Sequence, residues 1–206
     1  MKSFNFKDLQ IYTHKEVYEP SEDTFLLLES IDIKKGERFF EIGAGTGIIS
    51  LDLAKKGFDG VCCDINPIAI ELVKKNYLTN QSKLMASLDI RLGDMFNVLN
   101  LDEKFDVIIF NPPYLPTKPE EYVGGSGWFD KAVAGGVDGL SVTKRFLEKV
   151  GAFLKEHGRA YFVFSSLSNR SKLERIIKDN NFRYKVELSR LYDDEYIHIY
   201  SIFLSK

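Results

Sequence analysis

Cysteine is scarce in this chain of 206 residues, and the two that occur are adjacent, Cys62 and Cys63. Neighbouring residues of a strand point to opposite faces, so this pair is not expected to form a disulfide or to share a metal ion. We expect both thiols to be small, buried apolar groups. Histidine is equally rare, and His14, His157 and His198 lack the spacing of metal ligands. The sequence therefore predicts no metal site.

An excess of either charge sign is also missing, because 28 Lys and Arg residues face 30 Asp and Glu residues, a formal net charge of −2. Proteins that bind duplex nucleic acid usually carry a basic excess, since phosphate contacts dominate their affinity. Nucleic acid is therefore not expected as the primary partner. No run of 18 apolar residues occurs, and the first residues lack the apolar core of a signal peptide. We expect a cytoplasmic protein that does not associate with a membrane.

Strand-like and helix-like runs alternate along most of the chain. Strands are predicted at residues 37–42, 60–64, 88–92, 105–110 and 159–164, and helices at 21–31, 46–56, 66–80, 137–157 and 169–180. Such alternation is typical of an α/β protein with a mostly parallel, doubly wound sheet covered on both faces. The runs at 184–191 and 196–204 have no helix between them, which predicts an antiparallel hairpin at the sheet edge. The length fits a single domain over residues 1–206.

The tetrapeptide Asn111-Pro112-Pro113-Tyr114 directly follows the apolar run 105–110. Proline has no amide hydrogen, so the strand must end here and leave backbone carbonyls without partners. With the carboxamide of Asn111, these carbonyls place several acceptors at the carboxyl edge of the sheet, where open α/β sheets bind ligands. The cluster suits a substrate with N–H donors, such as an amide or an exocyclic amine. A strand that simply ends in a proline turn is the alternative interpretation.

Three glycines, Gly43, Gly45 and Gly47, separate the first predicted core strand from its helix. The dinucleotide fingerprint is G-x-G-x-x-G, whereas these glycines fall at every second position. No Lys-Ser or Lys-Thr pair follows, which excludes a phosphate-binding P-loop. Glycines at such a turn let a ligand approach the backbone closely, and the helix start offers free N–H groups.

Carboxylates follow the same edge of the predicted sheet. Glu41 precedes the glycine loop, Asp64 ends the second strand and Asp94 follows the third. Three acids would repel a diphosphate, but they would accept hydrogen bonds from the hydroxyl and amino groups of a cationic nucleoside ligand. The alternatives are a solvated strand end for Glu41, a helix cap for Asp64 and a turn residue for Asp94.

Together these motifs resemble the class I S-adenosylmethionine-dependent methyltransferases that methylate amino groups. Two further segments, Glu16-Val17-Tyr18-Glu19-Pro20-Ser21-Glu22-Asp23-Thr24 and Ala134-Gly135-Gly136-Val137-Asp138-Gly139, resemble the HemK-related family. Within that family the chain is similar to the short archaeal and eukaryotic branch, which methylates a glutamine side chain in peptide-chain release factors. The resemblance extends from about Glu16 to the end of the chain. The Asn-Pro-Pro-Tyr motif by itself is shared with methylases of DNA and RNA amines.

The resemblance implies a Rossmann-like, seven-stranded mixed sheet with S-adenosylmethionine along its carboxyl edge and S-adenosylhomocysteine as product. By position in the family motifs, the implied cofactor-binding residues are Thr24 at the methionine moiety, Glu41, Gly43 and Gly45 at its amino group and the loop, Asp64 at the ribose, Asp94 and Met95 at the adenine, and Asn111. The implied substrate-binding residues are Asn111, Pro112, Pro113 and Tyr114, of which Asn111, Pro112 and Tyr114 are the catalytic ones. In this hypothesis Asn111 and the Pro112 carbonyl accept the two N–H groups of the target amide, while Tyr114 packs against its plane.

Substrate recognition is expected to involve the glycine-rich loop 115–137, the N-terminal extension 1–15, or a partner. The resemblance also implies a second partner beside the release factor, because the short branch works with a small zinc-binding activator protein that adds to the sheet edge. The alternative function is N-methylation of an adenine or another exocyclic amine in DNA or RNA. A non-catalytic cofactor-binding protein is a third interpretation, and the glycine spacing disfavours a nicotinamide-linked oxidoreductase.

Overall fold

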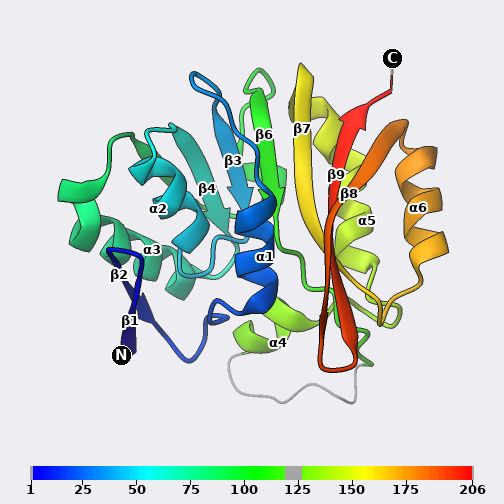
Figure 1. Cartoon of the computed structure of the whole chain (residues 1–206), viewed down its shortest axis with the longest axis horizontal. Coiled ribbons are helices and arrows are strands. Elements are labelled where there is room, and N and C mark those ends of the chain that lie inside the picture. Colours follow the sequence, from blue (N-terminus) through cyan, green and yellow to red (C-terminus); the bar gives the residue numbers. More distant parts are fainter. Residues whose placement is uncertain (1, 119–126, 206) are drawn as a thin grey trace.

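The computed structural model describes residues 2–118 and 127–205, and its main feature is a seven-stranded sheet (Figure 1). The strands lie in the order β5-β4-β3-β6-β7-β9-β8. Their bounds are β3 Phe39–Ile42, β4 Gly60–Asp64, β5 Leu88–Leu92, β6 Phe105–Phe110, β7 Leu154–Ser165, β8 Phe182–Tyr192 and β9 Glu195–Leu204. The pairs from β5 to β7 are parallel, whereas β9 is antiparallel to both β7 and β8. The predicted mostly parallel sheet with a C-terminal hairpin is confirmed.

Helices cover both faces of this sheet. They are α1 Glu22–Ser30, α2 Ile48–Lys55, α3 Pro67–Asn80, α4 Trp128–Val133, α5 Ser141–Val150 and α6 Arg170–Asp179, with short 3-10 turns η1 Gln81–Lys83, η2 Met95–Val98 and η4 Gly151–Phe153. Side chains of α1, α2 and α3 share one hydrophobic cluster, and those of α5 and α6 share another. Strand residues alternate between the two: Ile108 belongs to the α5–α6 cluster and Ile109 to the α1–α3 cluster. None of the helices in the described part of the chain is both long and apolar enough to cross a bilayer.

The adjacent cysteines follow the same alternation. Cys62 lies in the α1–α3 cluster and Cys63 in the α5–α6 cluster, and neither side chain is exposed to solvent. Both are free thiols, and burial raises the pKa of each one. The prediction that they are small buried apolar groups is confirmed.

One predicted helix is wrong in its extent. The sequence predicts a helix from 137 to 157 ended by Gly158, but α5 ends at Val150 and η4 leads directly into β7. Leu154 pairs with Phe105 of β6, so residues 154–157 are strand rather than helix. The helical tendency of Lys155-Glu156-His157 is therefore overridden by pairing with the neighbouring strand, as tertiary context commonly does.

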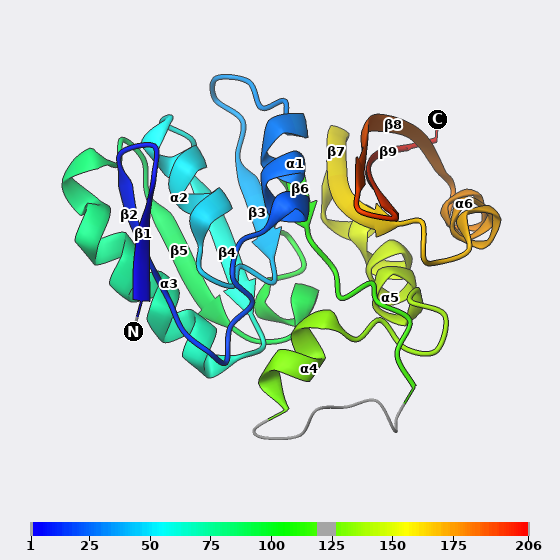
Figure 2. The same cartoon turned by 60° about the horizontal axis from the view of Figure 1, so that its bottom comes forward.

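The N-terminal hairpin was not predicted. Residues 1–15 were treated as an extension, yet β1 Lys2–Phe6 and β2 Leu9–Thr13 form an antiparallel hairpin. Leu9 and Ile11 are fully buried, and Asn76 and Asn80 of α3 accept the backbone N–H groups of Tyr12 and Gln10 at 2.8 and 2.9 Å. Figure 2 shows this hairpin beside α3, and α4 near the carboxyl ends of the central strands. The alternation of apolar and polar residues over 9–13 is the signal that could have revealed β2.

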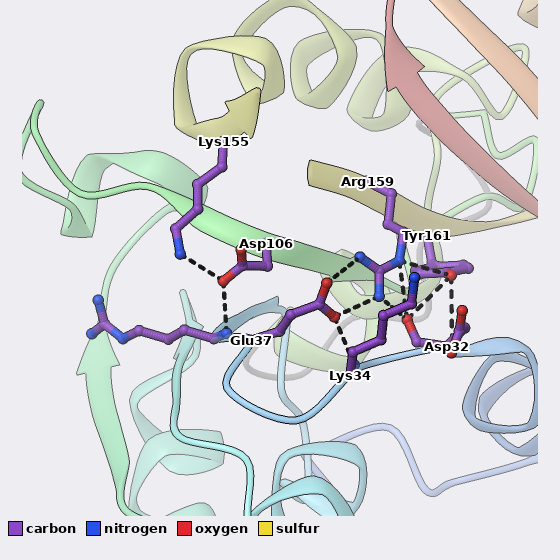
Figure 3. Close-up of polar contacts among 8 residues, drawn as sticks. Asp32, Lys34, Glu37, Asp106, Lys155, Arg159 and Tyr161 are labelled. Carbon is purple, nitrogen blue, oxygen red and sulfur yellow. Dashed lines mark hydrogen bonds and ion pairs between the residues drawn. The ribbon is translucent and has the colours of Figure 1, made fainter. Parts of the chain in front are cut away.

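A polar cluster at the amino end of the sheet ties β7 to the segment before β3 (Figure 3). Arg159, 8% exposed, donates from Nη1 and Nη2 to the two carboxylate oxygens of Glu37 at 3.0 and 2.7 Å. Its Nε also donates to the Asp32 carbonyl at 3.0 Å. Nearby, Lys155 pairs with Asp106 at 2.7 Å. The bidentate pair fixes both strands at the end opposite to the glycine loop.

Replacing Arg159 by alanine is expected to lower the free energy of unfolding by about 2 kcal/mol or more, because it removes the charged donor that the Glu37 carboxylate and the Asp32 carbonyl share. Urea unfolding followed by circular dichroism would measure the change. The exposed Arg175 of α6 provides the matched control, since Arg175→Ala should change the same quantity by no more than about 0.5 kcal/mol. Equal free energies of unfolding for the two variants would show that Arg159 does not stabilise the contact between β7 and the segment before β3.

Candidate active site

The carboxyl edge of the sheet encloses a cavity of about 740 Å³. Asn111-Pro112-Pro113-Tyr114 enters it directly after β6, because the prolines end the strand at this edge. Asn111 Nδ2 donates to Asp23 Oδ2 at 2.9 Å. Asn111 Oδ1 is buried and has no hydrogen-bond partner in the described part of the chain. A buried acceptor without a donor is costly, so this atom is suited to accept a hydrogen bond from a ligand.

Glu41 is the last polar residue of β3 and lies 3% exposed against the first turn of α2. Its Oε2 accepts hydrogen bonds from the backbone N–H of Ser50 at 3.0 Å and from the Ser50 hydroxyl. Burial raises the pKa of the Glu41 carboxyl to about 8, although these two bonds oppose the rise. The group also lines the cavity. A cationic ligand bound beside this buried carboxyl would favour its ionised form.

Asp64 at the end of β4 organises the glycine loop. Its Oδ2 accepts the N–H of Gly45 at 2.9 Å, and its Oδ1 accepts the N–H of Asn66 at 2.8 Å. Burial raises the pKa of this carboxyl. The N-cap of α3 is Asn66, whose side chain accepts the N–H of Ile68 at 2.9 Å. The alternative that Asp64 merely caps this helix is therefore wrong.

Asp94 and Met95 reach the same cavity from the turn after β5. Asp94 Oδ2 lies 2.5 Å from Arg145 Nη2 of α5, a pair between groups that are both partly exposed. Met95 has the left-handed φ of 50° and is 8% exposed, so the turn directs it inward. Arg145 also lines the cavity and was not singled out in the sequence, because its partner is 51 positions away.

Asp23, in the first turn of α1, joins the two halves of the site. It is 4% exposed; its Oδ1 accepts the N–H of Thr24 at 2.6 Å and its Oδ2 accepts the Tyr114 hydroxyl at 3.0 Å. In the sequence, Asp23 stands out only as part of a segment that resembles the family. An acid in the first turn of a helix is usually a surface charge that favours the helix dipole, which is why its role was missed.

The segment Ala134–Gly139 packs directly on the backbone of the Asn-Pro-Pro-Tyr turn. Gly139 has φ +70°, and a Cβ there would lie 2.4 Å from the Tyr114 carbonyl oxygen. Leu115 forms a parallel bridge with Ala134. Gly135 and Gly139 are thus required by close backbone approach, which explains their place in the sequence pattern.

The chain resembles known proteins over most of its length. The model of the family called "Methyltransferase small domain" matches residues 8–187. The chain belongs to this family.

Curated relatives place the methyltransferase within the HemK-related group. A protein of Methanocaldococcus jannaschii that carries the provisional name protein N5-glutamine methyltransferase is 38% identical over 88% of this chain and 87% of its own length. Human methyltransferase HEMK2 is 33% identical over 85% of this chain and 84% of its own. The eRF1 methyltransferase catalytic subunit mtq2 of Schizosaccharomyces pombe is 30% identical over 95% of this chain and 92% of its own.

A solved structure, the E. cuniculi Mtq2–Trm112 complex, has the same fold as the methyltransferase. Its matched chain superposes with a TM-score of 0.70 at 21% identity, covering 92% of this chain and 99% of that one. The predicted Rossmann-like class I architecture is confirmed, and the cofactor of the methyltransferase is S-adenosylmethionine.

The cavity of the methyltransferase fits this cofactor. Its volume is in the range of small-molecule sites. Besides Asn111 Oδ1, the hydroxyl of Thr46 is buried in its wall without a hydrogen-bond partner among the described residues. Acceptors and carboxylates dominate the polar lining, as a cationic ligand with amino and hydroxyl groups requires. Within residues 2–118 and 127–205, no three or more His, Cys, Asp and Glu side chains are grouped to hold a metal ion.

Every residue to which the resemblance assigns a role in binding cofactor or substrate lines this cavity, whereas Gly47 of the glycine loop does not. The structure brings together Thr24, Glu41, Gly43, Gly45, Asp64, Asp94, Met95, Asn111, Pro112, Pro113 and Tyr114. The residues missed are Asp23, Thr46, Arg145 and, from α4, Trp128 and Lys131. Part of the expected recognition loop 115–137, residues 119–126, lies outside the described residues.

Proposed function

We propose that this methyltransferase transfers the methyl group of S-adenosylmethionine to the side-chain nitrogen of the glutamine in the Gly-Gly-Gln motif of a peptide-chain release factor. The observation that carries the proposal is the buried Oδ1 of Asn111 at the wall of the cofactor cavity, which has no hydrogen-bond partner within residues 2–118 and 127–205. The names of relatives support it: the S. pombe protein is named for eRF1, and a Streptococcus pneumoniae relative, 27% identical over 76% of this chain and 57% of its own length, is a release factor glutamine methyltransferase.

The cofactor would be held along the carboxyl edge of the sheet. In this proposal Thr24 and the glycine loop with Gly43 and Gly45 contact the methionine moiety, and Glu41 accepts hydrogen bonds from its ammonium group. Asp64 would accept the ribose hydroxyls, and Asp94 with Met95 would contact the adenine. When bound, S-adenosylmethionine supplies an electrophilic methyl group on its sulfonium.

The target amide needs orientation because its nitrogen lone pair is delocalised. Asn111 Oδ1 and the Pro112 carbonyl would each accept one N–H of the amide, which turns the lone pair toward the methyl group. Pro113 would shape the turn, and Tyr114 would pack against the amide plane. This mechanism uses positioning and electrostatic stabilisation of the charge that develops on nitrogen, without a general base.

Recognition of the surrounding protein is assigned in the same proposal to the loop 115–137, in which α4 contributes Trp128 and Lys131 to the cavity wall. A small zinc-binding activator is proposed to add to the sheet at β5, which ends the strand order. Leu92 of β5 is 57% exposed and Met85 before it is 72% exposed. The presence of Trm112 in the complex named for the E. cuniculi protein supports an activator of this kind.

Methylation of an exocyclic amine in a nucleic acid is the second candidate. It is favoured by one relative, the tRNA1(Val) (adenine(37)-N6)-methyltransferase of Flavobacteriaceae bacterium, which is 34% identical over 59% of this chain and 52% of its own length. The same two acceptors could hold the two N–H groups of an adenine amine, so the acceptor must be decided by experiment.

The deciding experiment measures transfer of labelled methyl from S-adenosylmethionine to three acceptors: a cognate release factor, the same factor with Gln→Ala in its Gly-Gly-Gln motif, and single-stranded DNA. Each is tested with and without a candidate activator. Label on the wild-type factor alone is the expected result. Label on both forms of the factor would place the methyl elsewhere, and label on DNA alone would support the second candidate.

The affinity for the cofactor is expected to depend on pH through Glu41. Its pKa of about 8 means that the free protein holds this carboxyl mainly protonated at neutral pH, whereas binding an ammonium group requires the carboxylate. Binding must therefore release a proton, and affinity should rise roughly tenfold per pH unit between about pH 5.5 and pH 7. Calorimetric titrations with S-adenosylhomocysteine at several pH values would measure this.

Glu41→Gln provides the control, since glutamine cannot ionise. Its affinity should be lower and nearly independent of pH. The stability of the unliganded protein gives a second check: a raised carboxyl pKa makes the folded state bind more protons than the unfolded state between pH 4.5 and about 8. The free energy of unfolding should thus fall as pH rises through this window, and less so in the variant. A wild-type affinity that does not change with pH would contradict this role of Glu41.

A further inference from the structure

Asp23 makes more hydrogen bonds than a helix-start acid needs. Its Oδ1 accepts from Thr24 N–H at 2.6 Å, from the Thr24 hydroxyl at 3.2 Å and from the Tyr18 hydroxyl at 3.3 Å. Its Oδ2 accepts from Asn111 Nδ2 at 2.9 Å and from the Tyr114 hydroxyl at 3.0 Å. Among the described residues it has five such donors but no ion pair with Lys or Arg. This carboxylate is 4% exposed and lines the cavity.

The first consequence concerns the orientation of the Asn111 amide. A carboxylate offers only acceptors, so the end of the amide that faces Asp23 must be the NH₂ group. Asn111 Oδ1 then points away from Asp23, and it is this buried oxygen that has no partner among the residues that the structure describes. The reversed amide would place two acceptors against each other and a donor toward the substrate. Asp23 therefore decides that Asn111 presents an acceptor to the cavity.

The second consequence concerns charge. A hydrogen bond from an amide to a carboxylate is stronger than one between neutral groups, and burial strengthens it further. It draws electron density toward the Oδ1 end of the Asn111 amide. That oxygen becomes a better acceptor for an N–H group whose nitrogen grows positive as it forms a bond to carbon.

Tyr114 is fixed by the same group. Burial, followed by the charge of Asp23, raises the pKa of the Tyr114 hydroxyl, so it remains a donor to the carboxylate. The phenol ring is thereby held at the end of the Asn-Pro-Pro-Tyr turn. One carboxylate of α1 thus orients two side chains of the loop that follows β6.

We propose that Asp23 is a positioning residue for methyl transfer, which sets the amide of Asn111 so that Oδ1 faces the acceptor nitrogen. That Oδ1 faces the nitrogen that receives the methyl group rests on the function proposed above. The orientation of the Asn111 amide does not depend on it. Asp23 acts through Asn111 and Tyr114 and does not itself contact the reacting atoms.

Asp23→Asn keeps the shape of the side chain but introduces an NH₂ group toward Asn111. The Asn111 amide should then reverse and direct its own NH₂ group at the substrate. We expect kcat with the release factor to fall by roughly 100-fold, with KM for the cofactor changed only a few-fold. The exposed neighbour Glu22 gives the matched control, because Glu22→Gln removes a charge from the same turn and should leave kcat unchanged.

A double-variant cycle separates positioning from general damage to the fold. If Asp23 acts through Asn111, then Asp23→Asn should lower kcat much less in an Asn111→Ala background than in the wild type. If the fold-decreases in kcat of the two single variants multiply in the double variant, then Asp23 acts independently of Asn111. That result would overturn the proposal. Thermal unfolding of each variant checks that the comparison is made on folded protein.

A measurement without substrate keeps the inference separate from the proposed function. In ¹⁵N NMR spectra, the side-chain NH₂ signals of Asn111 should shift and lose protection from hydrogen exchange in Asp23→Asn, but not in Glu22→Gln. Unchanged Asn111 signals in Asp23→Asn would refute the proposal even if the release factor is methylated. If no release factor is methylated but the signals shift, the substrate assignment fails and the orientation of Asn111 stands.

Discussion

Asn111→Ala is expected to lower kcat by roughly 100- to 1,000-fold, which corresponds to about 3–4 kcal/mol of lost transition-state stabilisation. The variant removes the buried Oδ1 that has no partner in the described structure and leaves the neighbouring Pro112 carbonyl as the remaining acceptor. The developing charge on nitrogen then loses one of its two stabilising dipoles. Single-turnover transfer of labelled methyl would measure the change.

The expected decrease in kcat must be distinguished from weaker binding of the cofactor. Affinity for S-adenosylhomocysteine should fall only a few-fold in Asn111→Ala, because Glu41, Asp64 and the glycine loop remain. Asn100, an exposed residue before β6, offers a matched asparagine, and Asn100→Ala should retain the wild-type rate. An Asn111→Ala protein that binds cofactor normally and also methylates at nearly the wild-type rate would show that the mechanism is wrong.

Phe146→Ala is expected to lower the free energy of unfolding by about 3–5 kcal/mol. The Phe146 ring of α5 is fully buried, with centroids 5.9 Å from Phe96, 5.3 Å from Phe110 and 5.9 Å from Phe162. It therefore joins the helix to η2, β6 and β7 at once. Truncation leaves a cavity that these rings cannot fill without leaving their own contacts.

Urea unfolding gives the test, analysed as a two-state transition if fluorescence and circular dichroism coincide. Leu101 lies 89% exposed before β6, and Leu101→Ala should change the free energy of unfolding by no more than about 0.5 kcal/mol. Phe146→Leu should fall between the two variants because it keeps part of the volume. A loss below about 1 kcal/mol in Phe146→Ala would mean that the aromatic cluster repacks.

The strands β3, β4 and β6 could be predicted because each is a short, mostly apolar run bounded by turn residues. Where a strand boundary depends on a distant partner, the sequence was less informative. Residues 154–157 look helical in the sequence, but they belong to β7, which pairs with β6 from Leu154 and Phe105 onward. The N-terminal hairpin was missed for a related reason, since its stability comes from Asn76 and Asn80 on a helix far along the chain.

The residues of the site also differ in whether local sequence or distant contacts determine their position. Residues that follow strands at one edge, such as Asp64 and Asn111, could be placed together because parallel strands end side by side. Asp23 and Arg145 come from helices, and no local pattern tells which face of a helix turns toward the sheet edge. Their contacts with Asn111 and Asp94 join positions 88 and 51 residues apart, which only the assembled fold brings together.

The two adjacent cysteines can report how fast different parts of the folded protein open to solvent. Each thiol is sealed in a different hydrophobic layer, Cys62 under α1–α3 and Cys63 under α5–α6. A water-soluble thiol reagent can reach either sulfur only when the layer above it opens. Labelling rates at low denaturant would therefore measure the rate of opening on each face of the sheet separately. Equal rates would mean that both layers open in one event, whereas a faster Cys62 would mean that the face carrying the cofactor loop opens first.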